Sequence, residues 1–222
     1  MIDPSEVVAR AEAVRARIVA AGGGAEVELL AVTKGFGPDA IAAALQAGLV
    51  AVGENYAQEL LDKVAARAEL DGPGPEPSWH FIGRLQRNKV RQIAPYVALW
   101  QTVDRERLAV EIAGRAPGAG VLVQLNLSGE PQKGGCPPDE AAALVARAGA
   151  LGLDVRGLMG VAPAGPPEDA RPGFRRLVAL ADELGLPVRS IGMSADLEVA
   201  VEEGSTMVRI GRDLFGERPV RA

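Results

Sequence analysis

A lysine at the end of an apolar stretch is the first residue of this sequence whose position could serve chemistry. Residues 29–37 read LLAVTKGFG, which predicts a buried strand that ends just before Lys34. A lysine in such a place is usually a solvated charge on an apolar stem. Most of the 24 basic residues are arginines, however, and the lysines are Lys34, Lys63, Lys89 and Lys133. Because a lysine amine can lose its proton and attack a carbonyl, as an arginine cannot, Lys34 is a candidate nucleophile.

A second set of candidate residues lies near the C-terminus, where residues 192–213 read GMSADLEVAVEEGSTMVRIGRD. Two predicted strands end at the glycines of this segment, and each leads into a helix or a turn. Backbone amides at such places bind phosphate, and Gly192 and Gly211 would let the backbone approach a ligand closely. Ser194 could cap the helix that follows or reach a phosphate oxygen with its hydroxyl. Taken singly these residues suit an ordinary turn and cap, but together with Lys34 they predict a phosphate site.

An amine that faces a phosphate site suggests a phosphorylated aldehyde as the ligand, and pyridoxal 5′-phosphate is the common one. Lys34 would form an imine with the aldehyde carbon. The ring nitrogen of this ligand needs a partner, usually Asp or Arg. Arg209 precedes Gly211 by two residues, so the two share one face of the strand and Arg209 could be that partner. A non-covalent site for another phosphorylated metabolite, with Lys34 only as a charge clamp, is the weaker alternative.

The elements that must position these residues alternate regularly along the chain. Eight short apolar strands are predicted, one helical segment lies in each gap, and an extra helix over 4–21 comes first. This alternation favours a parallel sheet, and eight strands are the number that closes a barrel with a filled interior. The predicted strands are 28–33, 50–53, 78–82, 98–103, 121–127, 155–161, 188–192 and 207–210. The predicted helices are 38–48, 55–68, 86–94, 104–115, 138–150, 168–185 and 195–203.

We therefore expect an α/β fold, a (β/α)8 TIM-type barrel in a single domain over 1–222, with an extra N-terminal helix. An open doubly wound sheet is the runner-up, but no Gly-x-Gly-x-x-Gly turn follows the first strand. Active sites of such barrels lie at the carboxyl ends of the strands. Lys34, Asn55, Ser194 and Gly211 all follow predicted strands and would share this rim.

The composition argues against several classes of protein. A net charge of -5 and a pI of about 5.1 suggest no basic face for nucleic acid. The only cysteine, Cys136, cannot build a disulfide framework or a cysteine-based zinc site, which fits a reducing cytoplasm. No uncharged apolar run approaches the roughly 18 residues of a membrane span, and the N-terminus does not resemble a signal peptide. We expect a cytoplasmic protein without nucleic-acid or membrane partners and without a metal site.

Long ordered motifs of this chain resemble those of a known family. The stretches AVTKGF, GENYAQE, WHFIGRLQRNK, GMSADLEVAVEEGSTMVRIG and LFG are similar to motifs of the pyridoxal phosphate homeostasis proteins, and the resemblance runs from about residue 4 to 216. Members of that family are single-domain barrels similar to the N-terminal domain of bacterial alanine racemase. They are regarded as carriers and regulators of the cofactor, without an established turnover reaction.

The resemblance implies a role for individual residues. Lys34 would be the imine lysine, and Asn55 would lie beside the ring. Arg209 would face the pyridine nitrogen. The phosphate would be held by Ser194, Gly211 and Arg212, through a hydroxyl and backbone amides.

The chain departs from the family pattern in two places. Phe36 stands where many members carry a second lysine, so a role for such a lysine in passing the cofactor on is not expected here. Glu217, Arg218 and Pro219 stand where many members continue with Ala-Arg and a tyrosine. Lys133 does match a lysine of the family's corresponding loop. It could be a second, weaker aldehyde site, but we favour the interpretation that it is a solvated loop charge.

Two functions of different class remain open from the sequence. A carrier would hold pyridoxal phosphate on Lys34 and release it by imine exchange to free amines, amino acids or pyridoxal phosphate-dependent apo-enzymes. A small racemase or decarboxylase-like enzyme is the alternative, and it would need a second acid/base opposite Lys34. Tyr56 is the better of two tyrosine candidates and is expected to pack in the first turn of its helix, whereas His80 is expected to be a hydrogen-bonded core residue. Because no second domain is seen to supply a shared site, we expect a carrier that acts as a monomer, with no catalytic residue assigned.

Overall fold

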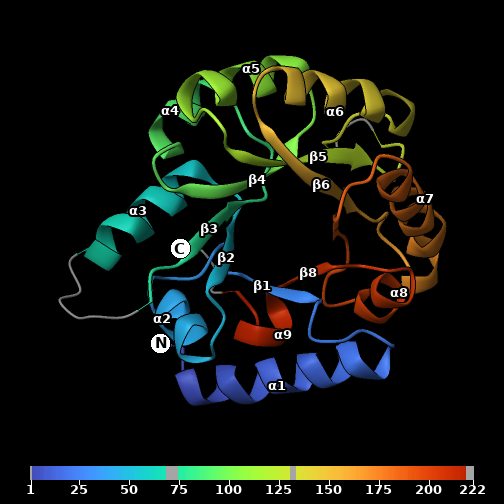
Figure 1. Ribbon diagram of the computed structural model, residues 1–222. Coiled ribbons are helices and arrows are strands. Elements are labelled where there is room, and N and C mark those ends of the chain that lie inside the picture. The colour runs from blue at the N-terminus through green and yellow to red at the C-terminus, as the bar shows by residue number, and fades with distance from the viewer. Residues whose placement is uncertain (1, 69–74, 131–133, 219–222) are drawn as a thin grey trace.

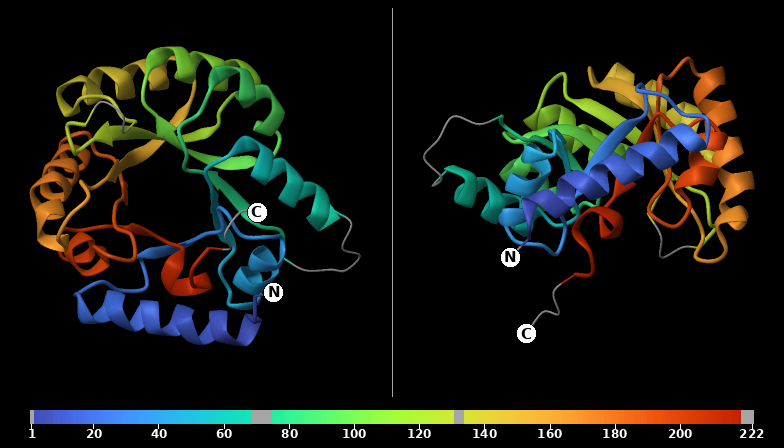
Figure 2. Two further views of the ribbon diagram at one scale, coloured as in Figure 1. Left: turned by 180° about the vertical axis from the view of Figure 1, so that it is seen from behind. Right: turned by 90° about the horizontal axis from the view of Figure 1, so that it is seen from below.

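Eight parallel strands close into a barrel in the computed structural model, which describes residues 2–68, 75–130 and 134–218. Every strand pairs in parallel with the next one along the chain, and β1 also pairs with β8. The helices surround this barrel, as Figures 1 and 2 show from opposite sides. The strands are β1 (Glu28–Val32), β2 (Ala51–Glu54), β3 (Ser78–Phe81), β4 (Val97–Val103), β5 (Gly120–Asn126), β6 (Asp154–Val161), β7 (Val188–Ser190) and β8 (Met207–Ile210).

One helix follows each strand, and α1 precedes the first. α1 carries buried residues three or four positions apart, begins at an Asp3 side chain that accepts from the Ser5 amide, and packs against α2, α8 and α9. The α-helices are α1 (Pro4–Ala20), α2 (Asp39–Gln46), α3 (Ala57–Ala68), α4 (Arg87–Ile93), α5 (Glu106–Arg115), α6 (Ala141–Ala150), α7 (Arg171–Glu183), α8 (Leu197–Glu202) and α9 (Arg212–Phe215). Short 3₁₀ turns, η1 (Pro138–Glu140) and η2 (Pro167–Ala170), lead into α6 and α7.

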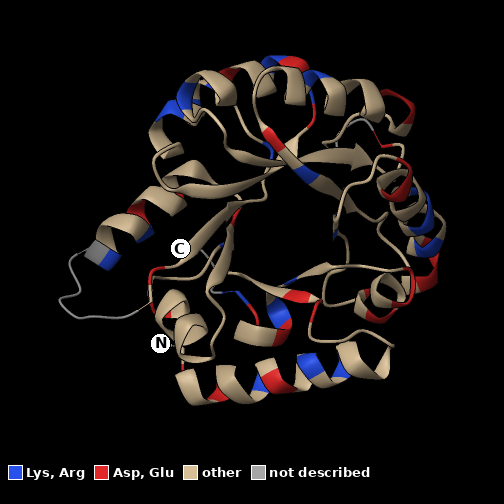
Figure 3. Ribbon diagram, viewed as in Figure 1, with Lys and Arg blue, Asp and Glu red and all other residues tan. Residues whose placement is uncertain are grey.

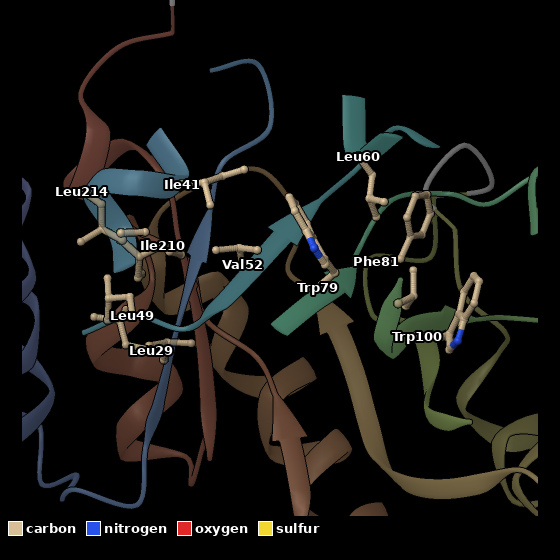
Figure 4. Close-up of a cluster of buried hydrophobic side chains, with 14 of the residues drawn as sticks. Leu29, Ile41, Leu49, Val52, Leu60, Trp79, Phe81, Trp100, Ile210 and Leu214 are labelled. Atoms are coloured by element: carbon tan, nitrogen blue, oxygen red, sulfur yellow. The ribbon is translucent and has the colours of Figure 1, made fainter. Parts of the chain in front are cut away.

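The strands are buried on both faces, because alternate side chains point into the barrel and out towards the helices. The inner layer is a small apolar cluster. It comprises Leu30, Ala51, Leu99, Leu122, Met159 and Met207. The outer layer is the main core. Figure 4 shows part of it, with side chains from the strands meeting Ile41 of α2, Leu60 of α3 and Leu214 of α9. Each large side chain buried in this way contributes about 1.5–3 kcal/mol.

The expected fold class is confirmed, and all eight strands and the helices between them agree with the predictions to within a few residues. One difference bears on the rim: β7 ends at Ser190, whereas the apolar pattern predicts a strand up to Gly192. Gly192 has a φ of +96°, a backbone conformation that leaves the strand and that a side chain would strain. The chain therefore turns towards α8 two residues early. Among the described residues, no helix is long and apolar enough to cross a membrane.

Candidate functional site

Lys34 lies at the carboxyl end of β1, between the two strands that flank it. β1 pairs with β2 on one side and with β8 on the other, so the ends of these three strands are neighbours. The Lys34 side chain is half-buried. Burial lowers the pKa of its amine, and the guanidiniums of Arg218 and Arg209 lower it further, against the carboxylate of Glu54, which raises it. A larger share of this amine is therefore uncharged at neutral pH than for an exposed lysine.

A buried ion pair lies behind Lys34 on the outer face of the barrel. Nζ of Lys63, on α3, donates to Oε1 of Glu54 at 2.5 Å and to the backbone carbonyl of Thr33 at 2.7 Å. The hydroxyl of Thr33 donates to the same Glu54 oxygen at 2.5 Å. Lys63 is 3 % exposed and Glu54 is fully buried, so this cluster fixes the backbone directly before Lys34.

Asn55 follows β2 and faces the interior of the rim. Its Oδ1 atom is buried and has no hydrogen-bond partner among the residues that the structure describes. The chain approaches it closely at Gly83, where a Cβ atom would stand 2.1 Å from the Asn55 carbonyl oxygen. Only glycine fits there, so the ends of β2 and β3 meet without an intervening side chain. A buried acceptor without a partner costs free energy unless a ligand or water supplies the donor.

Arg209 points from β8 into the barrel and lies at the head of a chain of hydrogen bonds. Its Nη1 donates to the Ser190 carbonyl at 2.5 Å and to the Ser190 hydroxyl at 2.8 Å, and its Nη2 donates to the Gly160 carbonyl at 2.7 Å. Burial lowers the pKa of Arg209 to about 10, so the guanidinium stays charged at neutral pH. Arg209 thus connects β8 with β7 and β6 near the carboxyl ends of these strands.

The same chain continues to the only histidine of the protein. The Ser190 hydroxyl accepts from Arg209, so it must donate to Oε1 of Gln101, at 2.7 Å. The Gln101 amide then donates from Nε2 to Nδ1 of His80, at 3.0 Å. Nδ1 is therefore an acceptor, and the ring proton of neutral His80 lies on Nε2. His80 is a hydrogen-bonded interior residue, as expected from its place inside a strand.

Acid is expected to destabilise the protein through His80. Burial, with a smaller contribution from Arg156, lowers the pKa of His80 to about 4. The unfolded chain has a histidine pKa near 6.5, so stability is fully present above that pH and is lost as the pH falls to about 4, by about 3 kcal/mol. Urea unfolding of wild type and His80→Gln at several pH values measures this: the stability advantage of wild type should shrink between pH 7 and pH 4. A constant difference over that range would contradict the assignment.

Ser194 and Gly211 belong to two adjacent loops, after β7 and β8. Of the two roles that the sequence left open for Ser194, the cap of α8 is not found: Asp196 is the residue before α8, and the Ser194 hydroxyl accepts from the Asp213 amide at 3.4 Å. Gly211 lies against the end of β1, where a Cβ atom would stand 3.1 Å from the Val32 carbonyl. Arg212 directs its exposed side chain towards Glu217, at 3.3 Å, and its backbone directly follows Gly211 at the start of α9.

The structure also describes most of the other residues singled out in the sequence. Tyr56 precedes α3 and is 57 % exposed, so the expectation that it packs in a helix turn is wrong. Cys136 is buried, and burial raises the pKa of its thiol to about 11. Phe36 packs against Phe215 with ring centroids 5.4 Å apart. Lys133 lies outside the described residues, and no group of acidic, histidine or cysteine side chains within them could hold a metal ion.

Lys63, Gln101 and Ser190 were not found from the sequence, and Glu54 was expected on the rim with no partner assigned to it. The signal for Lys63 was its spacing, because it follows Leu60 by three positions and so lies on the buried face of α3. Glu54 likewise continues the outward face of β2 after Val52. A charged residue of each sign on a buried face is a recognisable sign of a buried ion pair.

Comparison with known proteins agrees with this architecture. Residues 2–219 match the family described as the alanine racemase N-terminal domain. A pyridoxal phosphate homeostasis protein of Aquifex aeolicus is 44% identical over 203 residues, which cover 86% of this chain and 87% of that protein. The one from Escherichia coli K12 is 43% identical over 208 residues, which cover 87% of this chain and 86% of that protein. The solved structure of PipY from Synechococcus elongatus PCC7942 with PLP bound superposes with a TM-score of 0.80 at 31% identity, over 95% of this chain and 100% of that one.

The sequence identity to these relatives, and the share of each chain that is covered, establish the family of this protein. The chain belongs to the alanine racemase N-terminal domain family and, within it, to the pyridoxal phosphate homeostasis proteins.

Proposed function

We propose that this protein binds pyridoxal 5′-phosphate and takes part in its homeostasis, holding the cofactor covalently on Lys34 and releasing it to amines. The observation that carries the proposal is the amine of Lys34, half-buried on the rim with a lowered pKa. The names of the relatives and the PLP-bound state of PipY support the same ligand.

The residues of the rim fit this ligand. Asn55 has a buried oxygen that lacks a partner and lies at the end of the strand next to Lys34. Arg209 carries a permanent charge on the other neighbouring strand, where it could donate to the pyridine nitrogen. Ser194, Gly211 and the Arg212 backbone lie in the loops after β7 and β8, where barrels commonly bind phosphate. Together they offer a place for the ring and for the phosphate on either side of the lysine.

The covalent step needs only groups that are present. The uncharged Lys34 amine attacks the aldehyde carbon, a carbon–nitrogen double bond replaces the carbon–oxygen double bond, and the oxygen leaves as water. Release to another primary amine is an exchange on the same carbon: the incoming nitrogen forms the new carbon–nitrogen double bond, the bond to Nζ of Lys34 breaks, and the two protons of the incoming amine pass to Nζ, which leaves as a free amine. Neither direction needs an oxidant or a second acid/base residue.

Arg209 favours a carrier over an enzyme of carbanion chemistry. A guanidinium cannot give up its proton, so the pyridine nitrogen that it faces remains unprotonated. When bound, the cofactor supplies an electrophilic carbon and an electron sink, and an unprotonated ring is the weaker sink. Free amines, amino acids and apo-enzymes are the proposed recipients. We further propose that the chain acts as one domain over 1–222, as a monomer, in the cytoplasm.

Amine exchange tests this function. Protein loaded with pyridoxal phosphate should lose its imine absorbance when an excess of a simple primary amine is added, and the cofactor should then activate a dependent apo-enzyme. In heavy water, amino acids should show no steady Lys34-dependent exchange of the α-proton. Steady exchange that disappears in Lys34→Ala would favour the racemase or decarboxylase-like alternative instead.

A further inference from the structure

Arg17 joins the two loops to which the phosphate is assigned above. It lies in the last turn of α1, a helix that precedes the repeating strand–helix units of the barrel. Its Nε and Nη2 donate to the two carboxylate oxygens of Glu198 at 2.6 and 3.1 Å, and its Nη1 donates to Asp213 at 2.6 Å. Nη2 also donates to the backbone carbonyl of Ser194, at 3.1 Å. One guanidinium therefore contacts the loop after β7, the first turn of α8 and the first turn of α9.

We propose that Arg17 is a positioning residue for the phosphate site, which it reaches only through Ser194 and Asp213. The inference rests on the proposed function and adds a residue to it from outside the rim. α1 runs along α8 and α9 on the outside of the barrel, as Figure 1 shows, and charges of both signs lie along it (Figure 3). An extra helix thereby takes part in a site that the strand ends form.

Contacts of Ser194 indicate how the positioning works. Among the described residues, its hydroxyl has only the long 3.4 Å contact with the Asp213 amide, whereas Arg17 donates to its carbonyl at 3.1 Å. The loop is thus held mainly by its backbone, and the hydroxyl is left for a ligand. Without Arg17, the hydrogen bond that remains between Ser194 and Asp213 would be this long contact.

Charge gives Arg17 a second effect on the same site. The hydrogen bonds that Arg17 donates to Glu198 lower the pKa of Glu198 and raise the pKa of Arg17, so both remain charged at neutral pH. Asp213 adds a second carboxylate within 2.6 Å of the guanidinium. A phosphate dianion near two uncompensated carboxylates would be repelled. Arg17 compensates both of them where the phosphate is proposed to bind.

Arg171 provides a matched control in the same chain. It also contacts several carboxylates, those of Glu168, Glu202 and Glu203, at 2.7–2.9 Å. These contacts lie at the C-terminal end of α8, the opposite end from Ser194. Since Arg17 and Arg171 are both partly exposed, we expect neither substitution to unfold the protein.

The test compares ligands with and without a phosphate. Wild type, Arg17→Gln, Arg17→Lys and Arg171→Gln are titrated with pyridoxal 5′-phosphate and with pyridoxal, using the imine absorbance. Arg17→Gln should raise the apparent Kd for pyridoxal 5′-phosphate about tenfold and that for pyridoxal less than about twofold. The apparent Kd of Arg17→Lys for pyridoxal 5′-phosphate should lie between those of wild type and Arg17→Gln, because one ammonium cannot donate to three partners in the geometry of a guanidinium. Arg171→Gln should bind both ligands like wild type, and all four proteins should unfold in urea at similar midpoints.

Two results would overturn the inference: an unchanged affinity of Arg17→Gln for pyridoxal 5′-phosphate, or an equal loss for both ligands. If wild type forms no imine with either ligand, the proposed function fails. Calorimetric titration with inorganic phosphate then decides on Arg17, since binding by wild type that is weakened in Arg17→Gln would support its role. If wild type and Arg17→Gln bind phosphate equally, or if wild type does not bind it, the proposed role of Arg17 is wrong.

Discussion

Replacing Lys63 with methionine is expected to lower the free energy of unfolding by about 3–5 kcal/mol, as removal of one member of a buried ion pair does. Methionine has a similar volume but donates no hydrogen bond. Glu54 would then be a fully buried carboxylate without its ion-pair partner, and its Oε2 atom already lacks a hydrogen-bond partner within the described part of the chain. The Thr33 carbonyl would also lose its donor directly before Lys34. Urea unfolding monitored by circular dichroism measures the change.

Two further variants separate the buried charge from the loss of a lysine as such. Lys63→Met combined with Glu54→Gln should recover much of the lost stability, because the remaining amide carries no charge and can still accept from Thr33. Lys89→Met removes a half-buried lysine of α4 and should change stability by less than about 0.5 kcal/mol. Equal stability of Lys63→Met and wild type would show that the pair contributes nothing.

Arg209→Gln is expected to lower both the stability of the barrel and its affinity for pyridoxal phosphate. The guanidinium supplies the donors to the carbonyls of Ser190 and Gly160, and a buried acceptor that loses its donor costs about 1–3 kcal/mol. We therefore expect a loss of about 2–4 kcal/mol in the free energy of unfolding, and a weaker imine absorbance at equal ligand concentration. Arg209→Lys should recover only part of either, since an ammonium cannot span both strands as the guanidinium does.

Arg156→Gln is the control for this substitution. Arg156 lies on β6 but forms an exposed ion pair with Asp154 at 2.6 Å, and such pairs contribute about 0–1 kcal/mol. Its removal should leave the affinity for the cofactor unchanged. If Arg209→Gln were as stable as Arg156→Gln and bound the ligand equally well, the interior role of Arg209 would be wrong.

The barrel could be predicted from the sequence because the pattern of apolar residues that specifies its strands and helices is periodic. Each strand is a short apolar run, each helix shows buried residues at intervals of three or four, and eight such units allow few arrangements. The ends of the strands then place Lys34, Asn55 and Gly211 on one rim without knowledge of any contact. For the same reason Arg209 could be placed on the inner face of β8.

The partners of the charged residues could not be predicted in the same way. Arg17 contacts Glu198 and Asp213, nearly the whole chain away, and no spacing distinguishes these from the other acidic residues among the 29. A helix cap was one of two roles that the sequence allowed for Ser194, because capping depends only on neighbours in the chain, whereas its contact with Asp213 joins it to another loop. Lys63 is the clearest case: the scarcity of lysine drew attention to Lys34, and the same scarcity applies to a residue with a purely structural contact.

The most direct test of the central claim is to map where the cofactor attaches. Purified wild type and Lys34→Ala are mixed with pyridoxal 5′-phosphate, reduced with borohydride, digested and analysed by mass spectrometry. Lys34 should carry the pyridoxyl group in wild type, and the imine absorbance should be absent from Lys34→Ala, with Lys89 and Lys63 unmodified in both. A label on Lys89 or Lys133 alone, or an absorbance that persists without Lys34, would contradict the account. It would favour the alternative that the rim is a non-covalent phosphate site.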